Sequence, residues 1–190
     1  MCKPVIIMES IPSWEPTYKW DNNGGVVDMD SWDGKTVRIN KEWKYKYVDD
    51  SINLEFETIV KPGFITDGGS IPRFAWGMIA PFGIGLPGYL IHDAMYATWY
   101  LPRDISDKIL YDTIRHAGMG WFKSNTVYYT VRTFGGSAWK DHVTDKKTGN
   151  ITYRYLVKSR QYVDFILYKC NSKIREYLKE IDVLIESENK

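Results

Sequence analysis

GFITDGGSIP, residues 63–72, and LIHDAMY, residues 90–96, are the two stretches around which the chain is organised. In the first, glycines interrupt apolar sequence, and Pro72 suits the first turn of a helix because proline lacks only an N–H that would go unpaired there. This stretch therefore marks the point where a sheet ends and a helical part begins. The polar side chains of the two stretches include Asp67, Ser70, His92 and Asp93.

The residues before this point alternate between apolar and charged side chains, which is the period of a strand with one buried face. One strand is expected over residues 36–48 and a second over residues 54–58, with the turn at residues 49–51. Prolines and turn-forming residues dominate the region before them. Residues 1–34 are therefore expected to form a loop-rich arm, with one short strand at residues 4–8.

Three helices are expected after residues 63–72, because apolar residues there recur every three to four positions. They cover residues 88–100, 104–117 and 124–134. Asp104 is the expected N-cap of the second helix. Gly135 and Gly136 are expected to end the third helix and to open a loop. Residues 35–153 would then form the core domain.

The last part of the chain, residues 154–190, is expected to be one long amphipathic helix. Its apolar stripe recurs at intervals of three and four: Val163, Ile166, Cys170, Ile174, Tyr177, Ile181 and Leu184. The first half of this stripe is expected to pack on the domain. The second half is a candidate contact for phage structural proteins or for self-association through Ile174, Tyr177, Ile181 and Leu184.

These elements predict an α+β fold, in which an N-terminal antiparallel β-hairpin or small sheet packs on a bundle of about three to four helices. The chain has 190 residues, 44% of them hydrophobic, which suits one domain. Its formal net charge of +1 gives no signal for nucleic acid. No stretch is apolar for long enough to span a membrane or to serve as a signal peptide, and the only cysteines, Cys2 and Cys170, indicate no disulfide framework.

Asp107 is an exception to the pattern of its helix, because it lies on the face that should be buried. An unpaired buried carboxylate costs several kcal/mol. Asp107 is therefore expected either to cap its helix from the periphery or to meet a donor such as a histidine.

The other polar residues have simpler interpretations. Asp67 either binds a metal or caps a turn, and the two glycines after it favour the turn. Ser70 is expected to be a helix cap and not a nucleophile, since the G-x-S-x-G pattern is incomplete. Six aromatic residues are expected to be core and not a stacking platform for nucleic acid, since few basic residues are interleaved with them: Trp99, Tyr100, Trp121, Phe122, Tyr128 and Tyr129.

Four ordered blocks resemble a family found mostly in phages and prophages, the domain of unknown function 1353. The blocks are ETIVKPGFITDGGSIPRFAW, IHDAMY, RDISDKILYDTIRHAGM and TVRTFGGSAW, and they extend from about Trp43 to Trp139. The resemblance implies a phage or prophage origin and a compact α+β domain. The chain departs from the family pattern at Gly68, Gly69 and Pro102.

A looser similarity concerns chemistry. His92-Asp93-x-x-Tyr96 on one helix and Asp107 on the next are similar to the active site of the secreted phospholipase A-two superfamily. The resemblance implies that His92 is the base, that Asp93 binds calcium, that Asp107 orients His92 and that Tyr96 supports Asp107. Loop carbonyls at residues 82–85 would complete the calcium site. The half-cystines and the usual calcium-loop pattern of that superfamily are missing.

Two functions follow as expectations. The first is a phage-encoded, metal-assisted hydrolase-like domain in which Asp93 and Asp67 hold a divalent cation, with calcium favoured. The second is a non-enzymatic virion or tail-associated protein, in which the same polar cluster is a structural clamp. The protein is expected in the host cytoplasm during infection or in the virion.

Overall fold

A computed structural model of the chain describes residues 5–7, 27–31, 36–66, 83–148 and 159–188. Most of the expected N-terminal arm lies outside the described residues. So do Asp67 and Ser70, and the expected helix start at Pro72.

Four antiparallel strands form the main sheet, in the order β1-β4-β5-β7. Their bounds are Val5–Ile7 for β1, Trp43–Asp49 for β4, Leu54–Val60 for β5 and Val163–Lys169 for β7. The predicted hairpin is confirmed, since β4 pairs with β5 from Trp43↔Val60 to Asp49↔Leu54. A short 3-10 turn, η1, at Asp50–Ile52 joins these two strands, and Asn53 follows it in the left-handed region with φ 49°.

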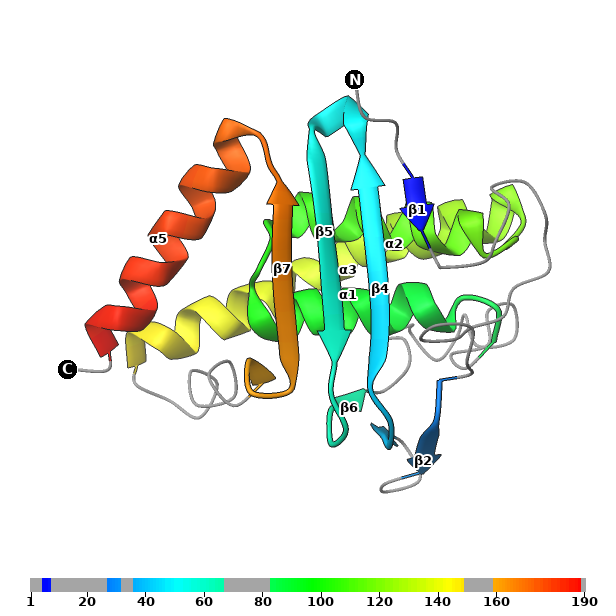
Figure 1. Cartoon of the computed structure of the whole chain (residues 1–190), viewed down its shortest axis with the longest axis horizontal. Coiled ribbons are helices and arrows are strands. Elements are labelled where there is room, and N and C mark those ends of the chain that lie inside the picture. Colours follow the sequence, from blue (N-terminus) through cyan, green and yellow to red (C-terminus); the bar gives the residue numbers. More distant parts are fainter. Residues whose placement is uncertain (1–4, 8–26, 32–35, 67–82, 149–158, 189–190) are drawn as a thin grey trace.

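A second sheet of three short strands lies at the open end of this hairpin, opposite η1, in the order β2-β3-β6 (Figure 1). The strands are Met29–Ser31 (β2), Val37–Ile39 (β3) and Ile65–Thr66 (β6). The expected single strand over residues 36–48 is therefore wrong, because the chain turns after Ile39 and changes sheet. Asn40 fixes this turn: its backbone N–H donates to the Asp28 carbonyl at 2.8 Å and its amide to the Asp28 carboxylate at 3.2 Å.

Three helices cover one face of the main sheet, and a fourth lies beside its β7 edge (Figure 1). They are α1 (Leu86–Thr98), α2 (Arg103–His116), α3 (Trp121–Thr148) and α5 (Ser172–Glu188). The first two match the expected helices closely. The expected cap at Asp104 is wrong, since Pro102 precedes α2 and no side chain caps it. The third continues through both expected glycine stops to Thr148.

The expected single C-terminal helix is also wrong, because its first part is the edge strand β7. Val163, Phe165 and Leu167 point to the core side, where Val163 is fully buried. Every second side chain thus faces the core, which is the period of a strand, and the β-branched and aromatic residues of this segment favour a strand as well. The apolar positions of β7 also fit intervals of three and four, and this coincidence favoured a helix. Helix α5 begins only at Ser172.

The core lies between the inner face of the main sheet and helices α1 and α2. Its largest fully buried side chains include Trp43, Tyr45, Tyr47, Leu54, Phe56, Leu90, Ile91, Met95, Leu101 and Ile109. Helix α3 packs on α1 and α2 through a smaller cluster that contains Val127 and Tyr89. On α5, Ile174 joins the main core, and Ile181 packs with Trp99. These two residues of the expected partner stripe are therefore buried by their own chain.

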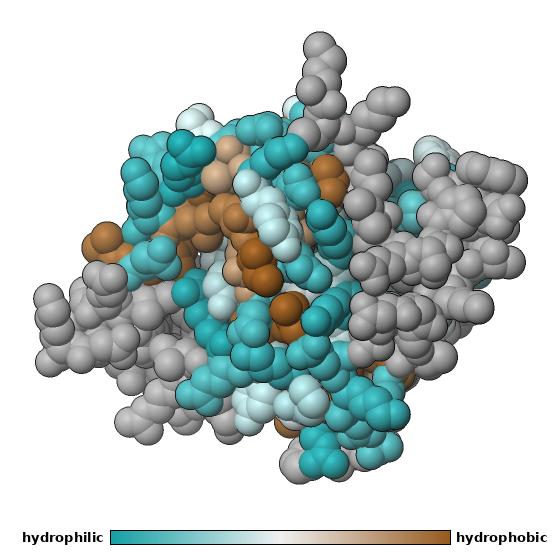
Figure 2. Space-filling model, viewed as in Figure 1, coloured by the Kyte–Doolittle hydropathy of each residue, from teal (hydrophilic) through white to brown (hydrophobic). Residues whose placement is uncertain are grey.

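The opposite face of the sheet is polar. Lys46 pairs with Glu55 at 3.1 Å, and Lys61 pairs with Asp164 at 2.6 Å. Figure 2 shows this side, where hydrophilic residues predominate and hydrophobic ones are visible between α5 and β7. In the described part of the chain, no helix combines the length and apolar character that crossing a bilayer requires.

A network of ion pairs and hydrogen bonds joins the sheet to α2. The Lys108 ammonium donates to the carboxylates of Asp49 and Asp112, at 2.5 Å each. The Tyr47 hydroxyl donates to Asp112 at 2.7 Å, and the Asp49 carboxylate also accepts from Ser51. Asp49 is almost fully buried, so these partners are what keep its charge inside the fold.

Close packing of α1 on α2 depends on Gly88. A β-carbon at this position would lie 2.5 Å from the Cγ2 atom of Ile114. We expect Gly88→Ala to destabilise the fold by about 1–3 kcal/mol despite the better helix propensity of alanine. Gly120→Ala is the matched control, since a β-carbon there meets nothing within 4 Å. Urea unfolding of both variants would measure the difference, and equal stabilities would contradict the close contact.

Candidate functional site

His92 and Asp107 meet where α1 crosses α2. His92 is on the second turn of α1, and Asp107 is on the second turn of α2. The Nε2 atom of His92 lies 3.0 Å from Oδ1 of Asp107, whose side chain is 0% exposed. Because an ionised carboxylate only accepts, Nε2 carries the proton of this hydrogen bond. The expectation that buried Asp107 meets a histidine donor agrees with this geometry.

Asp107 has further partners on both of its oxygens. The Tyr96 hydroxyl donates to Oδ1 at 2.7 Å, and Arg132 donates to Oδ2 at 3.0 Å. The guanidinium of Arg103 lies 3.6 Å from Oδ2 through its Nε atom. Since a buried carboxylate is costly unless it is paired and hydrogen-bonded, these donors explain how Asp107 is accommodated in the core.

Helix α3 brings Arg132 to this cluster and two glycines beside it. A β-carbon on Gly135 would lie 3.1 Å from the Tyr96 hydroxyl, and one on Gly136 would lie 3.0 Å from Arg103. Arg103 in turn donates to the carbonyls of Val131 and Arg132 at 3.0 and 2.7 Å. The glycines therefore give room for a close approach of α3 and do not end it, although each costs about 1 kcal/mol of helix propensity.

The other ring nitrogen of His92 faces Asp93. Nδ1 lies 4.0 Å from Oδ1 of Asp93, too far for a direct hydrogen bond. The Asp93 carboxylate accepts a hydrogen bond from the Thr66 hydroxyl of β6. The side chains of His92 and Asp93 are 10% and 18% exposed, whereas Asp107 is sealed. Nδ1 is thus on the more open side of the ring.

Both members of the pair have shifted pKa values. Burial lowers the pKa of His92, but the hydrogen bond to Asp107 and the negative charges of Asp93 and Asp107 outweigh burial, so the pKa is above its ordinary value. Burial raises the pKa of Asp107, but hydrogen bonds from His92, Tyr96 and Arg132 outweigh it, so the pKa is below its ordinary value. Both shifts favour the charged forms of the pair.

The expected calcium site lies only partly within the described residues. Calcium takes about six to eight oxygen ligands, and no group of three His, Cys, Asp or Glu side chains converges anywhere in the described ranges. Two of the expected loop carbonyls are in use, since Gly83 accepts from Leu86 at 2.9 Å and Gly85 from Tyr89 at 3.0 Å. Asp93 and the Thr66 hydroxyl are the oxygen donors found together. Asp67, the other expected ligand, lies outside the described residues.

The structure therefore brings together four of the five expected site residues, His92, Asp93, Tyr96 and Asp107. Sequence reasoning missed Thr66, Arg103, Arg132 and the glycine pair on α3. The two arginines and the two glycines carried a signal, because a buried carboxylate requires cations and two adjacent glycines inside a helical pattern indicate close packing. No local pattern indicated Thr66.

The expectation that the aromatic run is core is only partly correct. Trp99 is buried at the C-terminal end of α1, with φ 52°, and Tyr100 stacks on Phe165. Trp121, Phe122 and Tyr129 are exposed on α3. Helix α3 packs on α1 and α2 with one side only, so these three side chains point away from the fold.

Two buried carboxylates predict a loss of stability in acid. Burial raises the pKa of Asp49, but hydrogen bonds from Lys108 and Ser51 bring it below its ordinary value, and the pKa of Asp107 is lowered likewise. Their stabilisation is present above the unfolded-state pKa of 3.8 and is lost as pH falls through the folded-state values. His92, with its raised pKa, has the opposite sign: its stabilisation is present below the unfolded-state pKa of 6.5 and is lost as pH rises through its folded-state pKa.

We therefore expect the melting temperature to fall steeply below about pH 4. Asp49→Asn and Asp107→Asn should flatten this dependence, whereas Asp30→Asn, at an exposed position, should leave it unchanged. Thermal melts between pH 3 and 7 would measure the effect. A melting temperature that does not change below pH 4 would contradict the role of the two carboxylates.

The fold and the site define a small α+β domain with a buried histidine–carboxylate cluster. A family model described as "Protein of unknown function (DUF1353)" matches residues 37–131, half of the 190 residues, and the chain belongs to this family. The predicted family resemblance is thus confirmed. The match includes His92, Asp93, Tyr96 and Asp107 and ends one residue before Arg132. No curated protein and no solved structure matches the chain.

Proposed function

We propose that the chain is a hydrolase-like domain in which His92 acts as the general base. The observation that supports this most strongly is the asymmetry of its ring. Nε2 is bound to sealed Asp107, while Nδ1 faces the partly exposed Asp93. A histidine held by a carboxylate on one nitrogen can accept a proton on the other, and the carboxylate then stabilises the imidazolium.

In this reaction His92 Nδ1 takes a proton from water as the water attacks the substrate. Asp107 holds the ring through Nε2, and Tyr96 and Arg132 hold Asp107. The substrate classes consistent with such a base are an ester, an amide or a phosphoester. A lipid or cell-wall component in a phage-infected cell is the proposed setting, either in the host cytoplasm or with the virion.

A divalent cation, with calcium favoured, remains part of this proposal through Asp93 and Asp67. When bound, it would supply a Lewis acid that stabilises an oxyanion. The proposed proton transfer uses His92 and Asp107 alone, so it does not depend on the ion. Without the ion, Asp93 would position the attacking water beside Nδ1 of His92.

A panel of chromogenic esters, amides and phosphoesters, with calcium or with a chelator, tests the proposal. We expect turnover of at least one class. A metal role for Asp93 predicts that Asp93→Asn reduces the calcium stimulation, while Asp164→Asn on the outer face of the sheet leaves it intact. Absence of turnover on all three classes under both conditions would count against a hydrolase.

A non-enzymatic virion or tail-associated role is the second candidate. One observation favours it: both oxygens of Asp107 are bound within the chain, which also suits a structural clamp. Assembly through α5 would have to use side chains other than Ile174 and Ile181, which are buried. Val183 is exposed there, so Val183→Asp should block assembly while His92→Ala leaves it intact. The opposite pattern would reject this role.

A further inference from the structure

Helix α3 exposes an unusual set of large aromatic side chains. Trp121 and Phe122, adjacent in its first turn, are 66% and 67% exposed, and Tyr129 is 63% exposed. Phe122 and Tyr129 are seven residues apart and therefore share one face of the helix. Ile84, in the loop before α1, is also exposed. We call Ile84, Trp121, Phe122 and Tyr129 the aromatic face.

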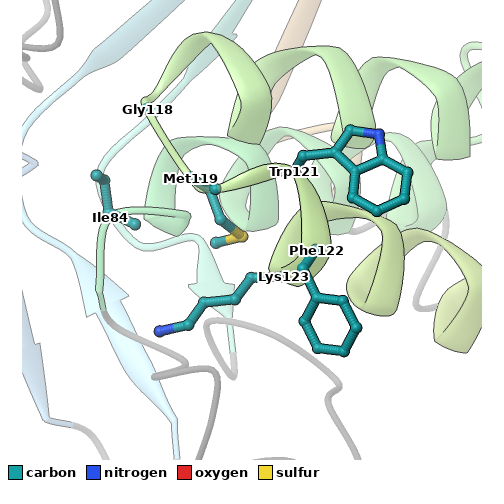
Figure 3. A pocket seen from close by; sticks show the side chains of 7 residues that line it. Ile84, Gly118, Met119, Trp121, Phe122 and Lys123 are labelled. Carbon is teal, nitrogen blue, oxygen red and sulfur yellow. The ribbon is translucent and has the colours of Figure 1, made fainter.

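A hollow of about 500 Å³ lies at the start of the aromatic face. It is lined by Ile84, Gly118, Met119, Gly120, Trp121, Phe122 and Lys123. Figure 3 shows the Trp121 and Phe122 rings projecting from the beginning of α3, while the Lys123 side chain extends below Met119 toward the side of Ile84. The hollow is thus apolar, with an ammonium group at its rim.

The charge of this region has one sign. Residues 113–140 contain two arginines and two lysines but no aspartate or glutamate, in a chain with 24 acidic residues. Lys123 is exposed among the aromatic residues, and Arg115 lies just before the hollow and donates to the Met119 carbonyl at 2.6 Å. A helix that combines exposed aromatic rings with cations and has no carboxylate between residues 113 and 140 is complementary to an apolar partner that carries negative charge.

We propose that the aromatic face binds the surface of an anionic lipid bilayer. Tryptophan and tyrosine favour the boundary between headgroups and acyl chains, where one end of the ring is apolar and the other is wet. Trp121 and Phe122 would enter this boundary at the first turn of α3. Lys123 would lie at headgroup level, with its stem along the hollow and its ammonium on phosphate. The proposal does not depend on the function proposed for His92.

The cations on this face are too few for nucleic acid, whose affinity comes mainly from many phosphate contacts. Arg132 is already bound to Asp107, and Arg115 to a backbone carbonyl. The exposed surface is therefore mainly aromatic, and its few cations could make few contacts with a phosphate backbone. At a membrane interface, by contrast, burial of the rings supplies most of the affinity, and a single cation adds a preference for anionic lipid.

Sedimentation of the full chain with phosphatidylglycerol or phosphatidylcholine vesicles tests the proposal. We expect binding to phosphatidylglycerol to exceed binding to phosphatidylcholine. Combining Trp121→Ser with Phe122→Ser should lower the partition coefficient on both by more than about tenfold, because two apolar side chains no longer enter the interface. Lys123→Gln should lower it about fivefold on phosphatidylglycerol only.

Matched controls lie on α5, away from this face. Val183→Ser removes an apolar side chain that is 64% exposed, and Lys179→Gln removes an exposed cation. Both should bind vesicles like the wild type. The proposal is overturned if phosphatidylglycerol vesicles do not sediment the protein or if the double variant binds them unchanged. It is also overturned if a single-stranded oligonucleotide binds more tightly than the vesicles, or if the double substitution instead dissociates a dimer in lipid-free sedimentation.

Discussion

Asp107→Ala is expected to destabilise the fold by about 3 kcal/mol or more, which is a large share of the stability of a domain of this size. Asp107 is the common acceptor for His92, Tyr96 and Arg132. Without it, the Tyr96 hydroxyl and His92 Nε2 lose their buried partner, and Arg132 loses the carboxylate that holds it against α2. Unpaired buried donors cost about 1–3 kcal/mol each.

Urea unfolding would measure this loss, with Asp104→Ala as the control on the same helix. Asp104 is exposed and pairs with Lys173 at 3.2 Å on the surface, so its replacement should cost less than about 1 kcal/mol. Equal effects of the two substitutions would show that Asp107 is not the centre of the cluster.

Asp107→Asn is expected to reduce the hydrolytic rate by about 10²–10⁴-fold with a smaller loss of stability. The reason is the direction of the hydrogen bonds. Arg132 can only donate, so the asparagine must present its carbonyl to Arg132 and its amide to His92 and Tyr96. Nε2 would then become an acceptor, and the proton of neutral His92 would move to Nδ1. The nitrogen that should accept a proton from water would be occupied.

This prediction has a readout that needs no substrate. Nitrogen-15 NMR of neutral His92 should show the proton on Nε2 in the wild type and on Nδ1 in Asp107→Asn. Arg132→Gln is the informative comparison, since glutamine can also donate to the Oδ2 side and should leave the proton on Nε2. If the tautomer is the same in the wild type and in Asp107→Asn, Asp107 does not orient His92 in the proposed way.

The sequence predicted the parts of the fold that depend on local patterns. The hairpin of β4 and β5, α1 and α2 follow from alternation and from helical periodicity, and each is present. Asp107 was predicted to need a donor because its helix face should be buried. That argument rests on the cost of burying charge, which holds wherever the partner comes from.

The errors occurred where long-range packing decides the structure. Val163–Lys169 fits both periods, and pairing with β5 selects the strand. Gly135 and Gly136 have the composition of a helix stop, but the close approach to Arg103 and Tyr96 selects a continuous helix. Arg132 reaches Asp107 across 25 positions of sequence, so no local motif contains both residues.

The most direct test of the central claim compares the wild type with His92→Gln on whichever substrate class the wild type hydrolyses. The glutamine amide can still donate to Asp107, so the variant should fold. It has no basic nitrogen in place of His92 Nδ1, so it cannot accept the proton from water. The rate should fall about 10²–10⁴-fold at an unchanged folded fraction. A folded His92→Gln variant with the wild-type rate would contradict the assignment of His92 as the base.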